Sequence, residues 1–480
     1  MFVVGVFLYY CLVALVVVWI SYWFYSWSNP KTKNGKLPPG SMGFPIIGES
    51  LQFFSAYSSH DIPPFIKKRV ERYGPLFRTS LVGQKIVIST DNEINYSIFR
   101  QENKSFQLWY TDSFGAILGN DESILGHNGK AHNYLKKLGL YLLGPEKLRK
   151  NLLQEMEEAT CTHLQSWAKN GSFDIRQGSS KLIFELIAKT VMSYEEEKDS
   201  KKLGESCKAF IEGLVSFPLN IPGTAFYASL QARKKIIKVI KDIYEDRKAS
   251  RVSRRDDFVD YLIEEVEKED TFLNDNSAVN IIFGIIFTGA ETISQAVTLL
   301  LNFVSDRLDV LTELTKEHET ILRKRDNENT GITWEEYKSM TFTHMVINEA
   351  MRIGNVTPGI FRKVVKDVEM NGYTIPAGWT VMIAPSTVHL NPDKYDNPST
   401  FNPWRWQGQE LNKGSKTFMA FGCGLRLCVG AEFAKLQMAI FLHYLVTRYK
   451  WSVINGGDFI RRPHLIFPNG MHVQIAEENK

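Results

Sequence analysis

A glycine-rich loop near the C-terminal end of the chain contains the residues best suited to chemistry. It places Arg426 two residues before Cys428, with Gly422 and Gly424 earlier in the loop. Glycines allow a backbone to approach a bulky planar ligand where a side chain would clash. The run from Ala431 onward has helical composition, which predicts Cys428 at a helix N-terminus, where the dipole favours a thiolate. A thiolate suits iron, and an arginine suits an acidic group on a macrocycle around that iron.

The two cysteines of this loop, Cys423 and Cys428, also admit plainer interpretations. They could be a buried pair, half of a zinc site or a disulfide. The chain has 5 cysteines, and no second pair has zinc-ligand spacing, so a structural zinc site has little support. A disulfide is not favoured in a chain that uses cysteine so sparingly. The haem-thiolate interpretation is favoured, and a buried pair stays open.

The complete pattern, Phe-x-x-Gly-x-Arg-x-Cys-x-Gly, resembles the haem-binding signature of the cytochrome P-450 superfamily at every fixed position. The resemblance implies a b-type haem whose iron takes Cys428 as its axial thiolate. The residues predicted to bind this cofactor are Cys428, Arg426, Phe421, Gly422, Gly424, Gly430, Arg362, Lys136 and His132.

Three of these candidates lie outside the loop. Arg362 resembles the strand arginine that contacts a haem propionate in relatives. His132 and Lys136 lie where relatives carry an aromatic residue or His, followed four residues later by Arg. Because Lys keeps the charge but loses the bidentate geometry, a surface role for Lys136 is an equal alternative.

The apolar run from Ile281 to Phe303 predicts a long buried helix. A second motif, formed by Gly289, Glu291 and Thr292, interrupts this run. Gly costs about 1 kcal/mol in a helix relative to Ala, and a buried acid costs more. The plain interpretation is a kinked helix whose threonine hydroxyl bonds back to its own backbone. The segment also resembles the family's oxygen-activation motif, in which Gly289 makes room above the iron while Glu291 and Thr292 deliver protons.

A third set of residues has a predicted structural role. Glu349 and Arg352 are three residues apart, which puts an acid and a base on one helix face. Arg405 stands between Trp404 and Trp406, and an arginine in an aromatic cluster needs a carboxylate such as Glu349. The three charged residues resemble the family's structural triad, which implies a role in stability.

The surrounding sequence predicts one large, mainly α domain with a minor β portion, and the resemblance implies the cytochrome P-450 fold. Apolar spacing predicts a mostly helical region from Leu148 to about Arg307. The predicted hairpin pairs Leu76–Val82 with Lys85–Thr90, further strands are expected at Phe361–Val365 and Thr380–Ala384, and helices are expected within Leu148–Trp167, Lys181–Tyr194, Ile236–Lys248 and Phe258–Val266.

The N-terminal segment predicts a membrane anchor. Phe2 to Trp27 holds no charged residue, and about 20 apolar residues suffice to cross a bilayer. The basic start and small-residue cleavage site of a signal peptide are missing. Lys31, Lys33 and Lys36 follow the run, so the positive-inside rule places the body of the protein in the cytoplasm. We predict a single-span anchor at 1–28, a proline-rich hinge at 29–45 and a haem-thiolate monooxygenase domain at 46–480.

The composition excludes one broad class of function. The 57 basic and 53 acidic residues give a net charge of +4, and no basic–aromatic stripe is present, which argues against nucleic-acid binding. The resemblance to microsomal family members instead implies an enzyme of the endoplasmic reticulum membrane.

The resemblance implies a monooxygenase that uses O2 and electrons from NADPH, passed on by the flavins of NADPH-cytochrome P-450 reductase. Segments 358–363, 372–379 and 401–406 are similar to plant enzymes that oxidise sterols, triterpenoids and terpenoid hormones. We therefore expect a lipophilic terpenoid or sterol substrate. The residues predicted to line its pocket are Trp109, Ile117, Phe217, Ile285 and Val356.

Other functions remain as alternatives. Repeated oxidation could cleave a sterol side chain, and the sequence does not choose between this and a single hydroxylation. An oxygen-independent haem isomerase or dehydratase acting on lipid peroxides is disfavoured by the Glu291–Thr292 pair and by the anchor. A haem or sterol carrier would leave that pair without a purpose.

Basic residues flank the haem loop at Lys413, Lys416 and Lys435. A solvated face is their usual role. Because electrons must enter from the thiolate side, we expect these lysines to form a docking patch for an acidic electron donor.

Overall fold

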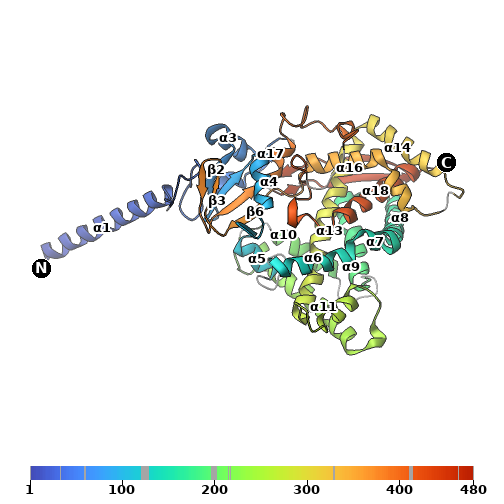
Figure 1. Ribbon diagram of the computed structural model, residues 1–480, viewed down its shortest axis with the longest axis horizontal. Helices are drawn as coiled ribbons and strands as arrows, with labels where there is room; N and C mark the ends of the chain where they lie inside the picture. The colour runs from blue at the N-terminus through green and yellow to red at the C-terminus, as the bar shows by residue number, and fades with distance from the viewer. Residues whose placement is uncertain are drawn as a thin grey trace.

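Helix α1 (Phe2–Ser28) extends away from the rest of the chain at one end of the molecule (Figure 1). The computed structural model describes residues 2–32, 34–58, 61–119, 129–195, 203–214, 216, 218–327, 330–409, 415–462 and 464–478. Within α1, Gly5–Ser28 is long and apolar enough to cross a membrane, with a mean hydropathy of 2.1 and none of it buried. Helix α13 (Asp275–Ser305) also qualifies by length and composition, but 67% of its apolar segment is buried in the body.

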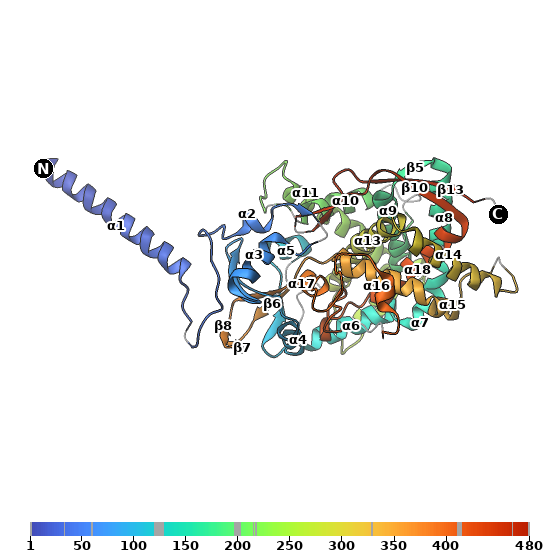
Figure 2. The same ribbon diagram turned by 90° about the horizontal axis from the view of Figure 1, so that it is seen from above.

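A five-stranded sheet lies at the end of the body nearest α1 (Figure 2). Its first two strands form the predicted hairpin, turning through Val82 and Gly83 with φ angles of +50° and +75°. The predicted later strands are also confirmed, and one of them pairs in parallel with the hairpin. The strand order is β2 (Leu76–Leu81), β3 (Gln84–Ser89), β9 (Thr380–Ile383), β6 (Ile360–Val364) and β4 (Phe106–Leu108).

The other described strands form three small sheets. Their orders are β1 (Tyr57–Ser58), β11 (Ile460–Arg461) and β12 (Leu465–Ile466); β10 (Tyr449–Gly456), β13 (Met471–Glu477) and β5 (Ser172–Asp174); and β7 (Val368–Met370) with β8 (Tyr373–Ile375).

Helices make up most of the body, as the sequence predicts. The α-helices besides α1 and α13 are α2 (Ser50–Phe53), α3 (Pro64–Tyr73), α4 (Asn92–Arg100), α5 (Asp112–Leu118), α6 (Gly129–Leu143), α7 (Pro145–Lys147), α8 (Leu153–Asn170), α9 (Ile175–Met192), α10 (Leu203–Leu214), α11 (Ala225–Ala249), α12 (Phe258–Val266), α14 (Leu308–Arg323), α15 (Trp334–Ser339), α16 (Thr341–Gly354), α17 (Pro385–His389) and α18 (Ala431–Arg448). Short π or 3₁₀ turns are η3 (Leu148–Leu152), η5 (Arg251–Ser253), η6 (Pro403–Trp406) and η7 (Gly424–Arg426).

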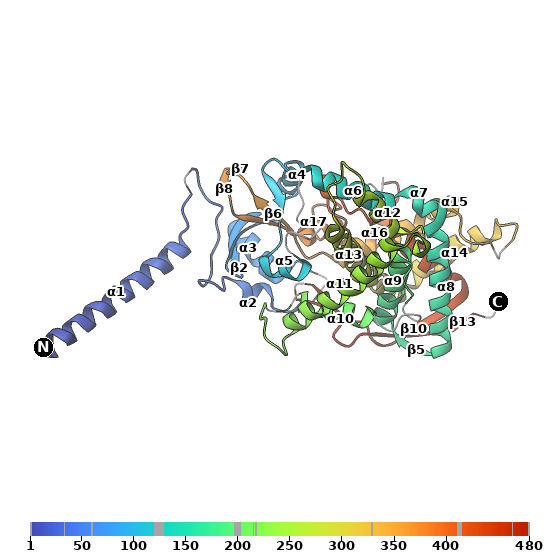
Figure 3. The same cartoon turned by 90° about the horizontal axis from the view of Figure 1, so that it is seen from below.

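Helix α13 carries the predicted motif of Gly289, Glu291 and Thr292. Asn274 caps its first turn by accepting a hydrogen bond from the Ser277 N–H at 2.8 Å. The helix crosses the helical part of the body with α9 and α11 packed beside it (Figure 3). It also packs against α16, which carries Glu349 and Arg352 of the triad, and against α18, which follows the cysteine loop. The three predicted motifs are therefore held together by one helical core.

Candidate active site

The cysteine loop has a backbone that requires its glycines. Gly422 and Gly424 adopt φ angles of +78° and +68°, in the left-handed region that L side chains rarely enter. A Cβ at position 424 would also lie 3.2 Å from the carbonyl oxygen of Phe99. The glycines thus permit both the turn itself and its close packing on the end of α4.

Cys428 lies two residues before Gly430, the N-cap residue of α18, as predicted. Its N–H donates to the carbonyl oxygen of Phe421 at 2.9 Å, which closes the loop. The side chain of Cys428 is accessible, whereas Cys423 is buried in the core, so the two are not a buried pair.

The pKa of the Cys428 thiol is raised, whereas a helix start by itself lowers the pKa of a thiol. Desolvation raises its pKa, and the backbone N–H of Gly430 opposes this without overcoming it. The Gly430 N–H thus acts in the direction expected at a helix start, and the thiolate itself stays a prediction. A bound metal cation would favour the thiolate, because a coordinating thiol is deprotonated outright.

Two predicted haem-binding arginines meet close to this loop. Arg362 of β6 donates from Nε to Glu102 Oε2 at 2.6 Å, and Arg426 of η7 donates from Nε to Glu102 Oε1 at 3.0 Å. Sequence reasoning missed Glu102, which follows α4 and stands in no motif. The structure thus adds a buried carboxylate between the two cations.

His132 on α6 completes this cluster. Burial, reinforced by the positive charge of Arg426, lowers the pKa of His132 to about 4, so the ring is neutral at physiological pH. Its Nδ1 is buried and has no hydrogen-bond partner among the described residues. An unpaired buried ring nitrogen beside two guanidinium groups fits the carboxylates of a haem. The residues present therefore suit the group that the sequence implies.

Lys136 has a more ordinary contact. Its Nζ donates to the carbonyl oxygen of Leu425 at 3.2 Å, in the cysteine loop. This hydrogen bond joins α6 to the loop backbone and matches the surface role kept as an alternative. A contact between Lys136 and the haem stays a prediction.

The threonines of α13 hydrogen-bond to their own helix. Thr288 Oγ1 donates to Gly284 O at 2.7 Å, and Thr292 Oγ1 donates to Thr288 O at 2.7 Å. The back-bonding of the plain interpretation is confirmed, and the helix remains continuous. Thr292 is nonetheless exposed, while Ile285 and Thr288 on the same face are partly accessible. A hydroxyl is thus available on an otherwise mostly apolar face.

Glu291 is held by side chains that the sequence did not connect to it. Arg176 of α9 approaches it at 3.4 Å, and Gln295 donates to it at 2.5 Å. Gly289 has a packing role as well, since a Cβ there would lie 2.4 Å from Ile187 Cδ1. The glycine lets α9 approach α13, and its predicted place above the iron remains a prediction.

The predicted triad is assembled in the core. Arg352 donates to both carboxylate oxygens of Glu349, at 2.9 and 2.8 Å, and both side chains are fully buried. Arg405 donates to the same carboxylate at 3.0 Å. Trp406 Nε1 and the Asn402 N–H add hydrogen bonds of 3.0 and 2.9 Å. Glu349 therefore joins α16 to the η6 segment.

The predicted pocket residues divide into two groups. Ile285, Val356 and Trp109 are partly accessible, which is compatible with contact to a ligand. Ile117 is only 1% exposed and packs in the hydrophobic core, so its pocket role has no support from exposure. Phe217 lies outside the described residues.

The predicted lysine docking patch is not formed as expected. Lys435 is 7% exposed, with its Nζ 5.7 Å from the Phe421 ring, so its placement on a docking surface was wrong. Lys416 is exposed but pairs with Glu93 at 2.7 Å. Lys413 lies outside the described residues. The reason for the error is that α18 turns Lys435 into the body.

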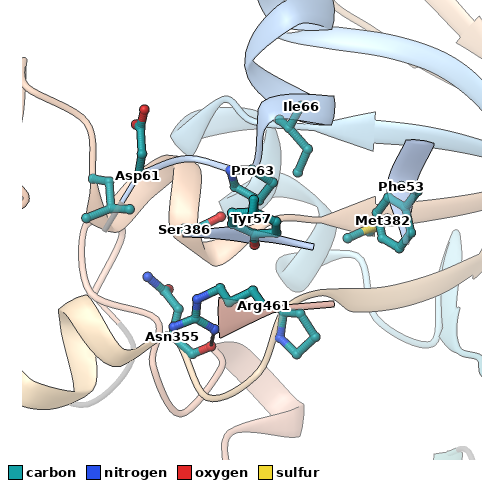
Figure 4. A pocket seen from close by; sticks show the side chains of 11 residues that line it. Phe53, Tyr57, Asp61, Pro63, Ile66, Asn355, Met382, Ser386 and Arg461 are labelled. Atoms are coloured by element: carbon teal, nitrogen blue, oxygen red, sulfur yellow. Dashed lines mark hydrogen bonds between the residues drawn. The ribbon is translucent and has the colours of Figure 1, made fainter. Parts of the chain in front are cut away.

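A small hollow elsewhere contains none of the predicted catalytic or haem-binding residues (Figure 4). Arg461 lies beside it and donates to the carbonyl oxygens of Gly354 and Asn355, which end α16. Tyr57 faces Arg461 across the hollow. Burial raises the pKa of Tyr57 to about 12, so the phenol is neutral. This hollow has a structural cation at its wall and is separate from the cysteine loop.

Comparison with known proteins decides the family. The cytochrome P-450 family model matches residues 38–472 of this chain. The chain belongs to the cytochrome P-450 family. The fold agrees, since the retinoic acid bound cyanobacterial CYP120A1 superposes with a TM-score of 0.80 at 24% identity, over 93% of this chain and 100% of that one. The protein is therefore a haem-thiolate monooxygenase with the cytochrome P-450 fold.

Several plant members of the family are similar to this chain in sequence. Cytochrome P-450 87A3 of Oryza sativa is 46% identical over 95% of this chain and 89% of that protein. Beta-amyrin 16-alpha-hydroxylase of Maesa lanceolata is 39% identical over 98% of both chains. Cucurbitadienol 11-hydroxylase of Siraitia grosvenorii is 38% identical over 97% of this chain and 98% of that protein. This cytochrome P-450 is thus similar to plant hydroxylases along nearly its whole length.

Proposed function

We propose that this cytochrome P-450 hydroxylates the polycyclic skeleton of a triterpenoid or sterol. The supporting observation is that full-length relatives are named as hydroxylases of beta-amyrin, cucurbitadienol and cholesterol. The accessible face of α13 suits such a substrate, because the Ile285 side chain is apolar and Thr292 supplies the hydroxyl. The reaction inserts one oxygen atom of O2 into a C–H bond and reduces the other to water, with two electrons from NADPH.

Different residues of the chain have different roles in this reaction. When bound, the haem would supply the oxygen chemistry, which a thiolate ligand favours. Cys428 would provide that thiolate, while Arg362, Arg426 and His132 would hold the acidic edge of the macrocycle. Thr292 holds and passes protons from its accessible hydroxyl. The apolar surroundings exclude water and orient the substrate.

A second candidate is repeated oxidation of one sterol. One relative, 35% identical over 95% of this chain, is named cholesterol 16,22-dihydroxylase. That name describes action at two positions, which requires that the first product bind again. Oxidation of a side chain in several steps therefore stays the alternative to a single hydroxylation.

We propose that the enzyme is anchored in the endoplasmic reticulum membrane with its body in the cytoplasm. The exposed helix α1 supports one span, and its length matches a bilayer. Phe44, Ile46 and Leu51, soon after the anchor, are 70%, 73% and 78% exposed. Large apolar side chains in such positions favour contact with the membrane surface. A membrane-bound NADPH-cytochrome P-450 reductase is the expected electron donor.

The substrate proposal is tested by co-expression with a reductase in microsomes. We expect NADPH-dependent hydroxylated products from one or more members of a panel of sterols, tetracyclic triterpenoids and pentacyclic triterpenoids, identified by mass spectrometry. Each product is supplied again as substrate, which separates one round of oxidation from several. Activity confined to fatty acids would overturn the substrate class, and turnover of hydroperoxides without NADPH would overturn the reaction.

Replacing Thr292 with alanine is expected to separate electron consumption from product formation. Without the accessible hydroxyl, proton delivery fails and reducing equivalents are lost as reduced oxygen. We expect product per NADPH to fall by about 10²-fold, the low end of the contribution of positioned proton transfer. Product and NADPH consumption are measured in the same microsomes.

A matched control for this substitution lies on the same helix. Thr298 also donates to the carbonyl four residues before it, at 2.8 Å, but is fully buried. Thr298→Ala should leave product per NADPH unchanged. An equal loss in both variants would show that the effect comes from the helix and not from the accessible hydroxyl.

A further inference from the structure

Glu102 connects two arginines that come from distant parts of the chain. It lies just after α4, whereas its partners lie in β6 and in the turn before the cysteine. The contacts are 2.6 Å to Arg362 and 3.0 Å to Arg426, one to each carboxylate oxygen. The side chains of Glu102, Arg362 and Arg426 are only 1%, 2% and 8% exposed. A carboxylate buried in this way must be compensated by its partners.

The geometry of these contacts differs from that of the structural pair in the core. Glu349 binds Arg352 side-on, through Nε and Nη2 together. Glu102 instead accepts from the Nε atoms of two different arginines, one at each carboxylate oxygen. A side-on pair joins one acid to one arginine, whereas Glu102 joins two arginines from distant segments. Nη1 of Arg362 donates to the carbonyl oxygen of Phe361 at 2.8 Å, which also fixes this guanidinium.

Two polar side chains and the cysteine loop lie close to these arginines. Tyr110 and His132 lie in the electrostatic range of both arginines, and burial raises the pKa of Tyr110, so it stays neutral. The buried Nδ1 of His132 has no hydrogen-bond partner among the described residues. Arg426 is two residues from Cys428. The cluster therefore adjoins the predicted iron ligand and places two cations near the buried ring nitrogen of His132.

We propose that Glu102 is a positioning residue for the haem. By fixing the Nε atoms of Arg362 and Arg426, it aims both guanidiniums at the haem carboxylates, and its negative charge moderates the positive field at the iron. The inference rests on the proposed roles of the two arginines. It assigns to Glu102 a task that neither the haem-binding signature nor the relatives' names contain.

The test replaces Glu102 with glutamine in the full-length, membrane-bound enzyme. Loss of the carboxylate should loosen the arginines, and transfer of haem to an apo-globin acceptor should become about tenfold faster. Loss of the negative charge should favour the ferrous state about tenfold, which corresponds to about 59 mV for one electron. The reduction potential is measured by redox titration, which requires no turnover. The result is therefore independent of the proposed substrate.

Two further variants make the outcome decisive. Glu102→Asp keeps the charge but shortens the reach, so haem transfer should accelerate while the reduction potential stays near that of the wild type. Glu93→Gln is the matched control, because Glu93 pairs with Lys416 on the surface, and it should change neither quantity. Unchanged haem transfer and potential in Glu102→Gln would overturn the proposal. So would failure of both Glu102 variants to fold, since Glu102 would then be a purely structural ion pair.

Discussion

Cys428→Ser should abolish both the haem-thiolate spectrum and the monooxygenase activity. A serine hydroxyl is a poor iron ligand at neutral pH and does not donate the electron density of a thiolate. We expect the carbon monoxide difference spectrum of thiolate-ligated haem to vanish and product formation to fall to the background of microsomes without the enzyme. Haem content, the carbon monoxide spectrum and turnover are measured on the same preparation.

Cys423 provides the control for this experiment. It lies in the same loop but is buried, and burial raises the pKa of its thiol. Cys423→Ala should keep the carbon monoxide spectrum and most of the turnover. Retention of the thiolate spectrum and full turnover in Cys428→Ser would refute the assignment of the iron ligand.

Glu349→Gln is expected to have the largest effect on stability. The substitution leaves the guanidinium of Arg352 buried without its countercharge, and also weakens the contact with Arg405. Breaking a buried pair by removing one partner costs about 3–5 kcal/mol. The free energy of unfolding should fall by that amount, as measured by urea titration with haem absorbance and far-UV circular dichroism as two probes.

A surface pair provides the matched comparison. Glu146 contacts Lys150 at 2.9 Å one helical turn away, and both side chains are well exposed. Glu146→Gln should leave the urea midpoint unchanged, because exposed pairs contribute little. Equal midpoints for Glu349→Gln and the wild type would show that the triad does not stabilise the core.

Local patterns predicted the parts of the site that are contiguous in sequence. The cysteine loop, the hairpin and α13 each depend on neighbouring residues, through glycine positions, turn chemistry and helical spacing. Their predicted positions agree with the structure. The direction of the pKa shift of Cys428 was not predictable in the same way, because burial in the folded protein raises the pKa while the Gly430 N–H lowers it.

Contacts between distant segments could not be predicted from such patterns. Glu102 is 260 residues from Arg362, and Arg176 is 115 residues from Glu291. The burial of Lys435 was equally unpredictable, because the elements packed around α18 decide which of its faces is turned inward. Charged residues in these positions look like ordinary solvated side chains until the fold brings them together.

The sequence alone predicted Cys428 as the iron ligand, the threonine of the central helix and the anchor, and it determined the mainly helical class. Each depends on residue types at short, fixed spacing, which local backbone geometry translates directly into structure. Only the tertiary structure decided which carboxylate holds the two haem-side arginines and which cation holds Glu291. Those pairings form because burial removes water from the charges, and burial is a property of the assembled core.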